Sequence, residues 1–493
     1  MATKSKSSNW DSLVILTAVS LVVFLAALDQ TVVVTILPPL MFDLGISFAE
    51  LNSASWIITG YLIGYTVAIP ITGNLADLYG YRRILVFALL LFLAGSVLVA
   101  LSTSLSAVIV GRVTQALGGG ATIPIGIALA SRAVKPQYRA VGIGMVGAAA
   151  ELGLVLGPLY GGFIESWLNW RWAFWLNIPQ VALMSLCILV FPSPSRRKST
   201  IDWIGSALLV GSLTILLIAL SSEDIFRFSS IKPYLLGITS IVGFIVLVRH
   251  EQSQNDPIID THILRFRPIL GALATKSIVG ATLIIPMVTI PLMTNTILDQ
   301  GVVEGALRLL RLTTALAAGV FLSGLVTTRF GPRITTLSGL LIACLGLFFM
   351  SSWGMSTPES HVTISSILTG LGIGLVMAPL FLIAIEFAAP HTIVRSVSLV
   401  LVARMIGMAI GMAAMTSWGV DQFQSLIDQM SISSESQAIT PRLEAQLAEY
   451  SRSIKEVGLG IFQNFLLGAS VLSLIALVPA LAISKNAERI RVV

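Results

Sequence analysis

The feature that most constrains this chain is a series of long apolar runs separated by short polar stretches. A bilayer core is about 30 Å thick, so one helical span needs about 20 mostly apolar residues. Such runs predict fourteen spans, at residues 13–37, 54–71, 84–101, 107–131, 141–164, 173–191, 202–220, 234–248, 269–297, 306–326, 335–353, 362–387, 397–418 and 459–483. With 55% hydrophobic and only 11% charged residues, the 493-residue chain is not a soluble globule. We predict an all-α multi-pass membrane protein.

Basic residues gather in alternate loops between these runs. They are Arg82, Arg83, Arg132, Lys135, Arg139, Arg196, Arg197, Lys198, Arg249, Arg265, Arg267, Arg329, Arg333, Arg395, Lys485, Arg489 and Arg491. Cytoplasmic loops collect Lys and Arg, so both termini are predicted in the cytoplasm of a bacterial cell, with the chain in its cytoplasmic membrane. The pI near 9.4 then reflects topology, and no nucleic-acid partner is expected.

Motifs of membrane enzymes and ATP-driven pumps are missing from the sequence. It contains no Walker phosphate loop, no His-Glu-x-x-His and no Gly-x-Ser-x-Gly. Cys187 and Cys344 lie inside predicted spans, and the four histidines have no ligand spacing. We therefore expect neither an enzyme nor a metal or other cofactor.

The chain repeats itself at nearly constant offsets of 251 to 255 residues. "GNLADLYGYRRI" (73–84) is echoed by "GLVTTRFGPRIT" (324–335), and "TQALGGGATIP" (114–124) by "TGLGIGLVMAP" (369–379). Two six-helix halves related by a repeat are a common design of secondary transporters. The predicted organisation is a cytoplasmic N-terminus (1–12), a first half (13–191), two inserted helices with a connector (192–268), a second half (269–483) and a cytoplasmic C-terminus (484–493).

Four motifs carry a resemblance to a known family. The loop after the second span has Gly73, Asp77, Gly80, Arg82 and Arg83; the fourth span has "RVTQALGGGATIP", beginning at Arg112. The fifth has "GLVLGPLYGG" (153–162), and "NWRWAFWLNIP" (169–179) enters the sixth. These resemble the major facilitator superfamily, in particular its fourteen-helix drug:proton antiporter branch. The resemblance implies an exporter driven by the proton gradient and working by alternating access.

A narrower resemblance is to the mycobacterial triacylglyceride exporters, which work with a lipid-binding lipoprotein. It rests on "LDQTVVVTI" (28–36), "AELGLVLGPLYG" (150–161) and "VARMIGMAIGMAAMTSWG" (402–419). It implies a lipid or other lipophilic substrate, membrane lipids as surroundings and a lipoprotein partner outside the cytoplasm. The alternative is a multidrug antiporter that expels amphiphilic, often cationic drugs. The polar segment 420–457 could extend the last two spans, dock the lipoprotein or form a solvated loop.

The loop motif has a physical reading of its own. Gly73 and Gly80 let the backbone turn tightly, and Asp77 can sit near a helix N-terminus. Such a charged latch could hold one conformation; the alternative is a loop that only sets topology. Thr328 stands where the repeat would place a second Asp77, so any latch there should be weaker.

The fifth-span motif and its echo predict close helix packing. The residues are Gly153, Gly157, Pro158, Gly161, Gly162, Gly407 and Gly411. Four-residue spacing places glycines on one helical face, and Pro158 adds a bend. The resemblance implies that this span abuts its counterpart in the other half.

Ionisable residues inside spans are the candidate coupling groups, because a charge at the bilayer centre costs at least about 2.5–3.5 kcal/mol. Asp29, Glu151 and Arg404 are the main candidates, with Asp29 as the coupling acid. Glu151 and Arg404 lie roughly 15 Å and roughly 10 Å deep on spans that the repeat pairs, so they could meet. Secondary candidates are Arg112, Lys276, Arg308, Arg311 and Glu386. The last four lie close enough to span ends for snorkelling.

Overall fold

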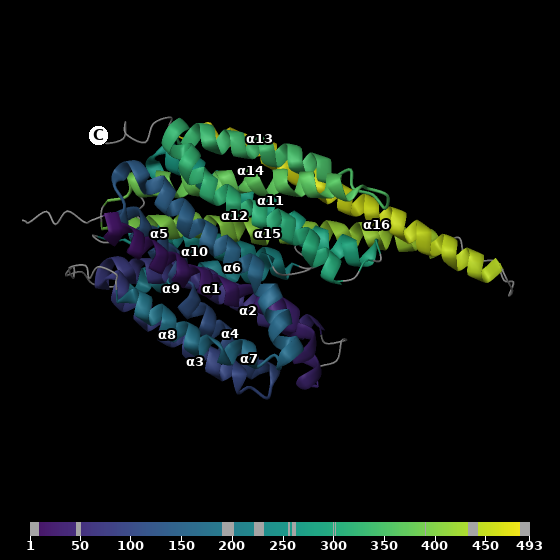
Figure 1. The fold of residues 1–493 in the computed structure, drawn as a ribbon, viewed down its shortest axis with the longest axis horizontal. Coiled ribbons are helices and arrows are strands. Elements are labelled where there is room, and N and C mark those ends of the chain that lie inside the picture. Colours follow the sequence, from purple (N-terminus) through teal and green to yellow (C-terminus); the bar gives the residue numbers. More distant parts are fainter. Residues whose placement is uncertain are drawn as a thin grey trace, which may run out of the picture.

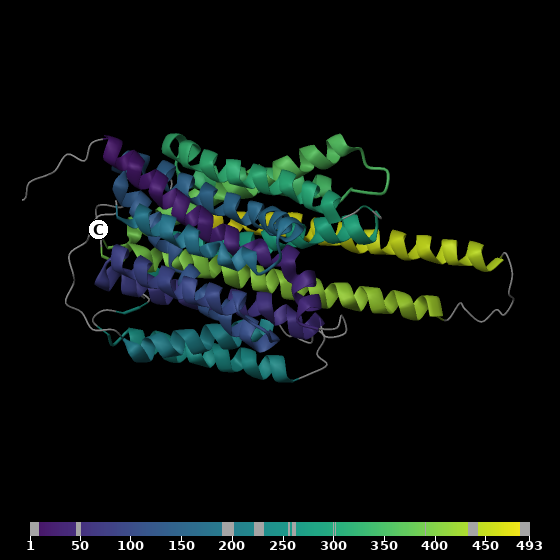
Figure 2. The ribbon, with the colours of Figure 1, turned by 60° about the horizontal axis from the view of Figure 1, so that its bottom comes forward.

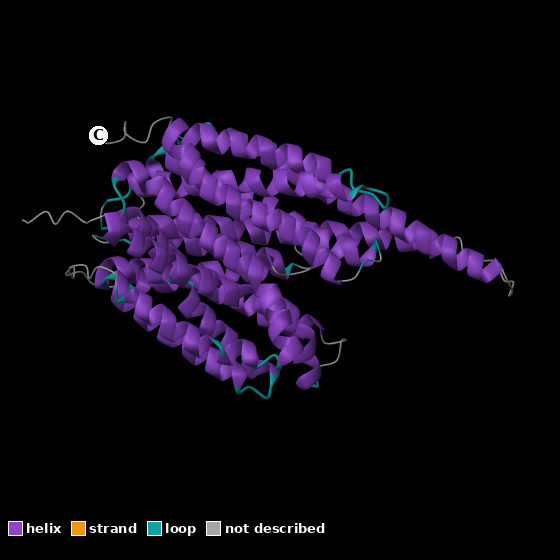
Figure 3. Ribbon diagram, in the orientation of Figure 1, coloured by secondary structure: helices purple, strands orange, loops and turns teal. Residues whose placement is uncertain are grey.

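Helices account for all the regular structure among the residues that the computed structural model describes (Figure 3). These residues are 9–45, 51–189, 202–220, 231–254, 257–258, 263–298, 300, 302–389, 391–431 and 442–483. The long apolar runs leave little alternative, since a backbone surrounded by lipid must satisfy its hydrogen bonds within each segment.

The first half contains α1–α8, and the two inserted helices follow. In order, they are α1 (Asn9–Asp43), α2 (Leu51–Tyr79), α3 (Tyr81–Ala100), α4 (Leu105–Gly119), α5 (Thr122–Ala133), η2 (Pro136–Tyr138), α6 (Arg139–Trp167), α7 (Trp172–Trp175), α8 (Asn177–Ile188), α9 (Trp203–Leu220) and α10 (Lys232–Glu251). The short helix η2 joins α5 to α6. The helices α9 and α10 pack on each other at one edge of the bundle, where α9 contacts α2 and α15 (Figure 2).

The second half contains α11–α17, and the short helix η3 (Ile263–Arg265) precedes it in the connector. They are α11 (Arg267–Thr296), α12 (Val302–Phe330), α13 (Pro332–Met350), α14 (Glu359–Phe387), α15 (Ile393–Ser431), α16 (Arg442–Ile475) and α17 (Leu477–Ala480). Both α15 and α16 project beyond the other helices at one end of the bundle (Figures 1 and 2). Helical extension of the last two spans, one of the options for segment 420–457, is thereby confirmed over the described residues.

Thirteen helices in the described part of the chain are long and apolar enough to cross a membrane. Each corresponds to one of the predicted spans. The remaining prediction, 173–191, corresponds to the shorter apolar helical stretch Trp172–Ile188. A multi-pass membrane protein is therefore confirmed.

One end of the bundle carries the arginine-rich turns, and we call it the basic end. Its described arginines include Arg82, Arg83, Arg132, Arg139, Arg249, Arg329, Arg333 and Arg395, which lie in or beside the first and last turns of their helices. Here Gly80 and Gly331, paired by the repeat, have φ angles of 96° and 82°. Only glycine adopts such angles readily, so the prediction of a glycine turn is confirmed at Gly80. Gly73 instead lies inside α2.

The glycines of the fifth-span motif pack within their own half rather than across to the other. The glycine face of α6 lies against α1 and consists of Gly153, Gly157 and Gly161. Two threonines of α1 add hydrogen bonds to this contact: Thr31 donates to the Leu154 carbonyl at 2.8 Å and Thr35 to the Pro158 carbonyl at 3.0 Å. The repeated glycines of the second half also pack within their own half, because Gly407 and Gly411 of α15 face α11. The resemblance implied that this span abuts its counterpart: its glycine face lies against α1 instead, whereas α6 and α15 meet through Glu151 and Arg404.

Gly407→Ala should destabilise the protein by about 1–3 kcal/mol, since the added methyl group would overlap the Ser277 carbonyl of α11. Gly162→Ala is the matched control: no atom lies within 4 Å of the methyl position there, and alanine is the better helix former. Thermal unfolding in detergent should show a lower midpoint for Gly407→Ala and an equal or higher one for Gly162→Ala. Equal midpoints for both variants would contradict the packing argument.

Candidate functional site

Asp29 lies in the middle of α1 and is 1% exposed. An Nη1 of Arg112, on α4, lies 3.2 Å from its Oδ2, and Asn177 of α8 donates to its Oδ1 at 2.6 Å. Asp29 was expected to be the coupling acid and Arg112 a secondary charge. The two form one buried ion pair, which the sequence did not indicate.

Uncharged side chains complete the network around this pair. Gln115 accepts a hydrogen bond from Arg112 at 2.5 Å, and the guanidinium lies 4.0 Å from the centre of the Tyr61 ring. The Ser96 hydroxyl accepts from both Gln115 and Asn177, at 2.9 and 3.1 Å. The network therefore joins α1, α2, α3, α4 and α8 around one carboxylate.

Glu151 and Arg404 form the second buried pair, and it crosses between the halves. Arg404 of α15 donates to both carboxylate oxygens of Glu151 on α6, at 2.5 and 3.3 Å. Both residues are buried. A bidentate arginine–carboxylate contact is among the stronger ion pairs. The expectation that these residues meet is confirmed.

Lys276 is the third deeply placed charge. It is fully buried on α11, with its Nζ 2.7 Å from the Met377 sulfur and 4.5 Å from the centre of the Phe381 ring. Snorkelling to the membrane surface, the alternative raised from its position in the span, is wrong for this residue. The sequence places Lys276 near a span end but does not show which way the side chain turns.

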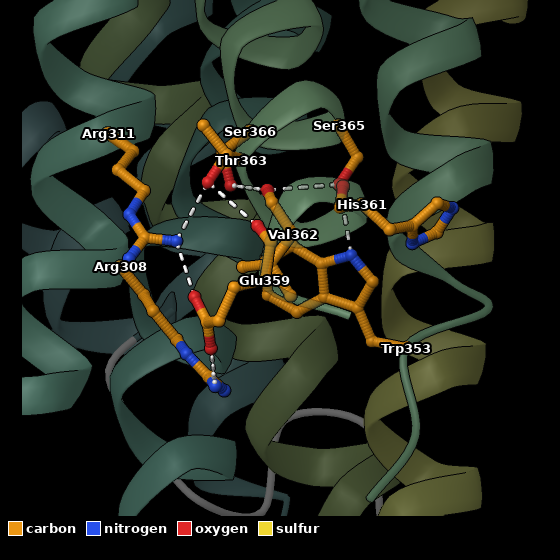
Figure 4. Close-up of polar contacts among 9 residues, drawn as sticks. All are labelled: Arg308, Arg311, Trp353, Glu359, His361, Val362, Thr363, Ser365 and Ser366. Carbon is orange, nitrogen blue, oxygen red and sulfur yellow. Dashed lines mark hydrogen bonds and ion pairs between the residues drawn. The ribbon is translucent and has the colours of Figure 1, made fainter. Parts of the chain in front are cut away.

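Arg308 and Arg311 share one carboxylate at the end opposite to the basic end. Arg308 and Arg311 of α12 donate to Glu359, the first residue of α14, at 2.5 and 2.6 Å (Figure 4). Arg311 also donates to Thr363 at 2.9 Å. Arg308 is buried and held by this carboxylate, so snorkelling does not describe it either. Glu386 is half-buried near the other end of α14.

Asp77 joins the halves at the basic end. Its Oδ2 accepts a hydrogen bond from the backbone N–H of Arg395, in the first turn of α15, at 3.1 Å. Ser398 donates to the Ile69 carbonyl at 3.0 Å, and Gly73 leaves room for the Ser398 side chain. An acid at a helix N-terminus was expected, and the structure adds that the helix belongs to the other half.

The second-half copy of the motif makes a more local contact. Thr328 donates to the Leu325 carbonyl of its own helix at 2.6 Å. Gly324 lies against the backbone of Ala140, at the start of α6. Thr328 therefore bonds within its own helix, whereas Asp77 accepts a hydrogen bond from the other half.

The entry to the sixth span is anchored at the end opposite to the basic end. Arg171 pairs with Asp43, at the end of α1, and donates to the Ser102 carbonyl at 3.1 Å. The hydrogen bond from Arg171 holds the pKa of Asp43 below its usual value near 3.8. This part of "NWRWAFWLNIP" therefore fastens α1, the end of α3 and the start of α7 together.

The uncharged members of the Asp29 network were missed from the sequence. Asn177, Gln115, Ser96 and Tyr61 carry no charge, so a pattern of ionisable residues inside spans does not include them. The sequence did contain a signal for two of them, because Gln115 lies in "TQALGGGATIP" and Asn177 in "NWRWAFWLNIP". Amides inside spans need partners, because unpaired polar groups are costly in an apolar environment.

Two helical halves with buried charged groups where they meet are typical of secondary transporters. Residues 19–412 match the family described as Major Facilitator Superfamily. The chain belongs to this superfamily.

Relatives and solved structures extend this finding. A "Triacylglyceride transporter" of Mycobacteroides abscessus is 35% identical, covering 88% of each chain, and a similarly named protein of Mycolicibacterium smegmatis is 33% identical, covering 98% of this chain and 89% of the relative. Structures of the human organic anion transporter MFSD10 and the proton:xylose symporter XylE each align with a TM-score of 0.60. Their identities are 16% and 14%, covering 94% and 93% of this chain and 99% and 94% of theirs. At such identities the two structures show the fold alone.

Proposed function

We propose that the protein is a proton-coupled exporter that moves triacylglyceride-like lipid out of the cytoplasmic membrane by alternating access. The observation that carries the proposal is the Glu151–Arg404 pair, a titratable tie between the two halves. The names of the relatives support the lipid substrate. The arginine-rich turns support a cytoplasmic basic end.

The proposed cycle follows from this geometry. With Glu151 charged, its bond to Arg404 and the Asp77–Arg395 contact would hold the two halves together and keep the basic end closed. A proton that reaches Glu151 from the opposite side removes the charge and weakens the tie to Arg404. The halves then part at the basic end, lipid enters, and loss of the proton to the cytoplasm restores the pair. Proton movement inward is thereby linked to lipid movement outward.

Asp29 is the proposed coupling acid of the first half. It is bound to Arg112 and Asn177, on two different helices. A change in its charge would therefore alter contacts of α4 and α8 as well as α1. We propose that Asp29 and Glu151 each take up and release a proton in turn. When deprotonated, each carboxylate pairs with its own arginine, Arg112 for Asp29 and Arg404 for Glu151.

We also propose that the projecting parts of α15 and α16 receive a lipid-binding lipoprotein. This rests on the helix bounds, since both helices continue past their candidate spans Ile393–Met415 and Lys455–Ala480. A partner at this place could accept lipid as it leaves the bundle. Shortening both helices by matched turns should abolish co-purification with such a lipoprotein while preserving the fold.

Reconstitution into liposomes with an imposed pH gradient tests the function. We expect export of fluorescent triacylglyceride that depends on the gradient, and no comparable export of a cationic lipophilic dye. Dye export without lipid export would favour the multidrug antiporter instead. Movement of neither substrate, with an intact protein, would overturn the proposed function.

A further inference from the structure

The two inserted helices form a tied hairpin. Ser240 of α10 donates to the Ser212 carbonyl of α9 at 2.8 Å, in the middle of the pair. At the basic end, His250 lies 2.9 Å from the carboxylate of Asp202, just before α9 begins. The hairpin is therefore held both at its centre and at the basic end.

Ile258, in the connector after α10, is attached to this hairpin. The Ile258 backbone N–H donates to Glu251, the last residue of α10, at 2.7 Å. Glu251 is buried, and its carboxylate lies where a side chain on Gly205 of α9 would have to go. A buried carboxylate that accepts a backbone hydrogen bond is a strong anchor for a chain segment.

Arg395, on α15, also binds the connector, next to Ile258. Its Nη1 donates to the Pro257 carbonyl at 2.6 Å, whereas its backbone N–H donates to Asp77. The side chain is buried. One residue at the start of α15 thus holds the connector with its side chain and the first half with its backbone.

We propose that Arg395 is a positioning residue through which the inserted hairpin and its connector stabilise the closed basic end. The start of α15 cannot leave Asp77 without breaking the Arg395–Pro257 bond or pulling Pro257 and Ile258 away from Glu251. Pro257 and Ile258 are in turn fixed to the hairpin through Glu251. The Arg395–Pro257 bond therefore favours the closed state of the basic end. The inference rests on the proposed alternating access, and it gives the two inserted helices a mechanical role.

A buried cysteine can report the opening of the basic end directly. Ser398 is 1% exposed where α2 meets α15, so the reporter variant is Ser398→Cys. The two native cysteines are removed by Cys187→Ser and Cys344→Ser. Maleimide labelling in lipid nanodiscs then reports opening without any transported substrate. Arg395→Gln should raise the labelling rate roughly tenfold, the effect of losing one charge-assisted hydrogen bond. Arg395→Lys can still donate to Pro257 and should largely restore the original rate.

A second variant and a control isolate the connector. Glu251→Ala keeps Arg395 but frees Ile258, and it should raise labelling in the same direction. Arg249→Gln removes an exposed arginine from the same end of α10 and should leave labelling unchanged. Thermal unfolding verifies that each variant is folded. Unchanged labelling in Arg395→Gln, or in Glu251→Ala, would overturn the inference, whereas failed lipid export with these shifts intact would count against the proposed function alone.

Discussion

Arg404→Ala is expected to abolish gradient-driven export and to destabilise the closed state. It leaves the Glu151 carboxylate buried without its cation, and breaking a buried ion pair from one side costs about 3–5 kcal/mol. The bond between α6 and α15 would then be absent, as in the open step of the proposed cycle. Lipid export in liposomes and labelling of Ser398→Cys measure the two effects.

The double variant Arg404→Leu/Glu151→Leu separates stability from transport. Replacing both members of a buried pair by apolar residues is often neutral for stability, so the unfolding midpoint should recover. Export should not recover, because the titratable tie is gone. Arg311→Ala serves as the control, since this partly exposed arginine leaves Arg308 to hold Glu359. Full export by Arg404→Ala would contradict the role of the pair.

The helices could be predicted from the sequence because the bilayer makes the signal local: each span must be apolar over its own length. The meeting of Glu151 with Arg404 could be predicted for a different reason. The repeat places their helices as counterparts, and a simple count of residues places both charges at similar depth. Neither step requires knowledge of how side chains pack.

Predictions that depended on which neighbour a helix faces were less secure. The partner of Asp29 is Arg112, 83 residues away, and neither spacing nor the repeat relates them. The glycine face of α6 meets α1 rather than α15, because four-residue spacing describes one helix alone. Lys276 shows the same limit, since a residue near a span end can turn inward as readily as outward. In each case the missing information is tertiary.

Asp29→Asn should reduce export driven by a pH gradient at least tenfold while largely preserving exchange of lipid across the membrane at equal pH. The asparagine has the same shape and can still accept the hydrogen bond from Asn177. It cannot release a proton, so the driving force is uncoupled from the carrier movement. It also leaves Arg112 without its counter-charge, although Gln115 and the Tyr61 ring still hold the guanidinium.

Asp43→Asn is the matched control, because it makes the same chemical change at the far end of the same helix. Asp43 binds Arg171 at the surface of the bundle, and its side chain is 44% exposed. An exposed ion pair contributes at most about 1 kcal/mol, so export should be close to normal. The comparison therefore tests burial and partner together. If Asp29→Asn and Asp43→Asn both export lipid at the original rate under the gradient, Asp29 does not couple transport to protons, and Glu151 is left as the acid that must do so.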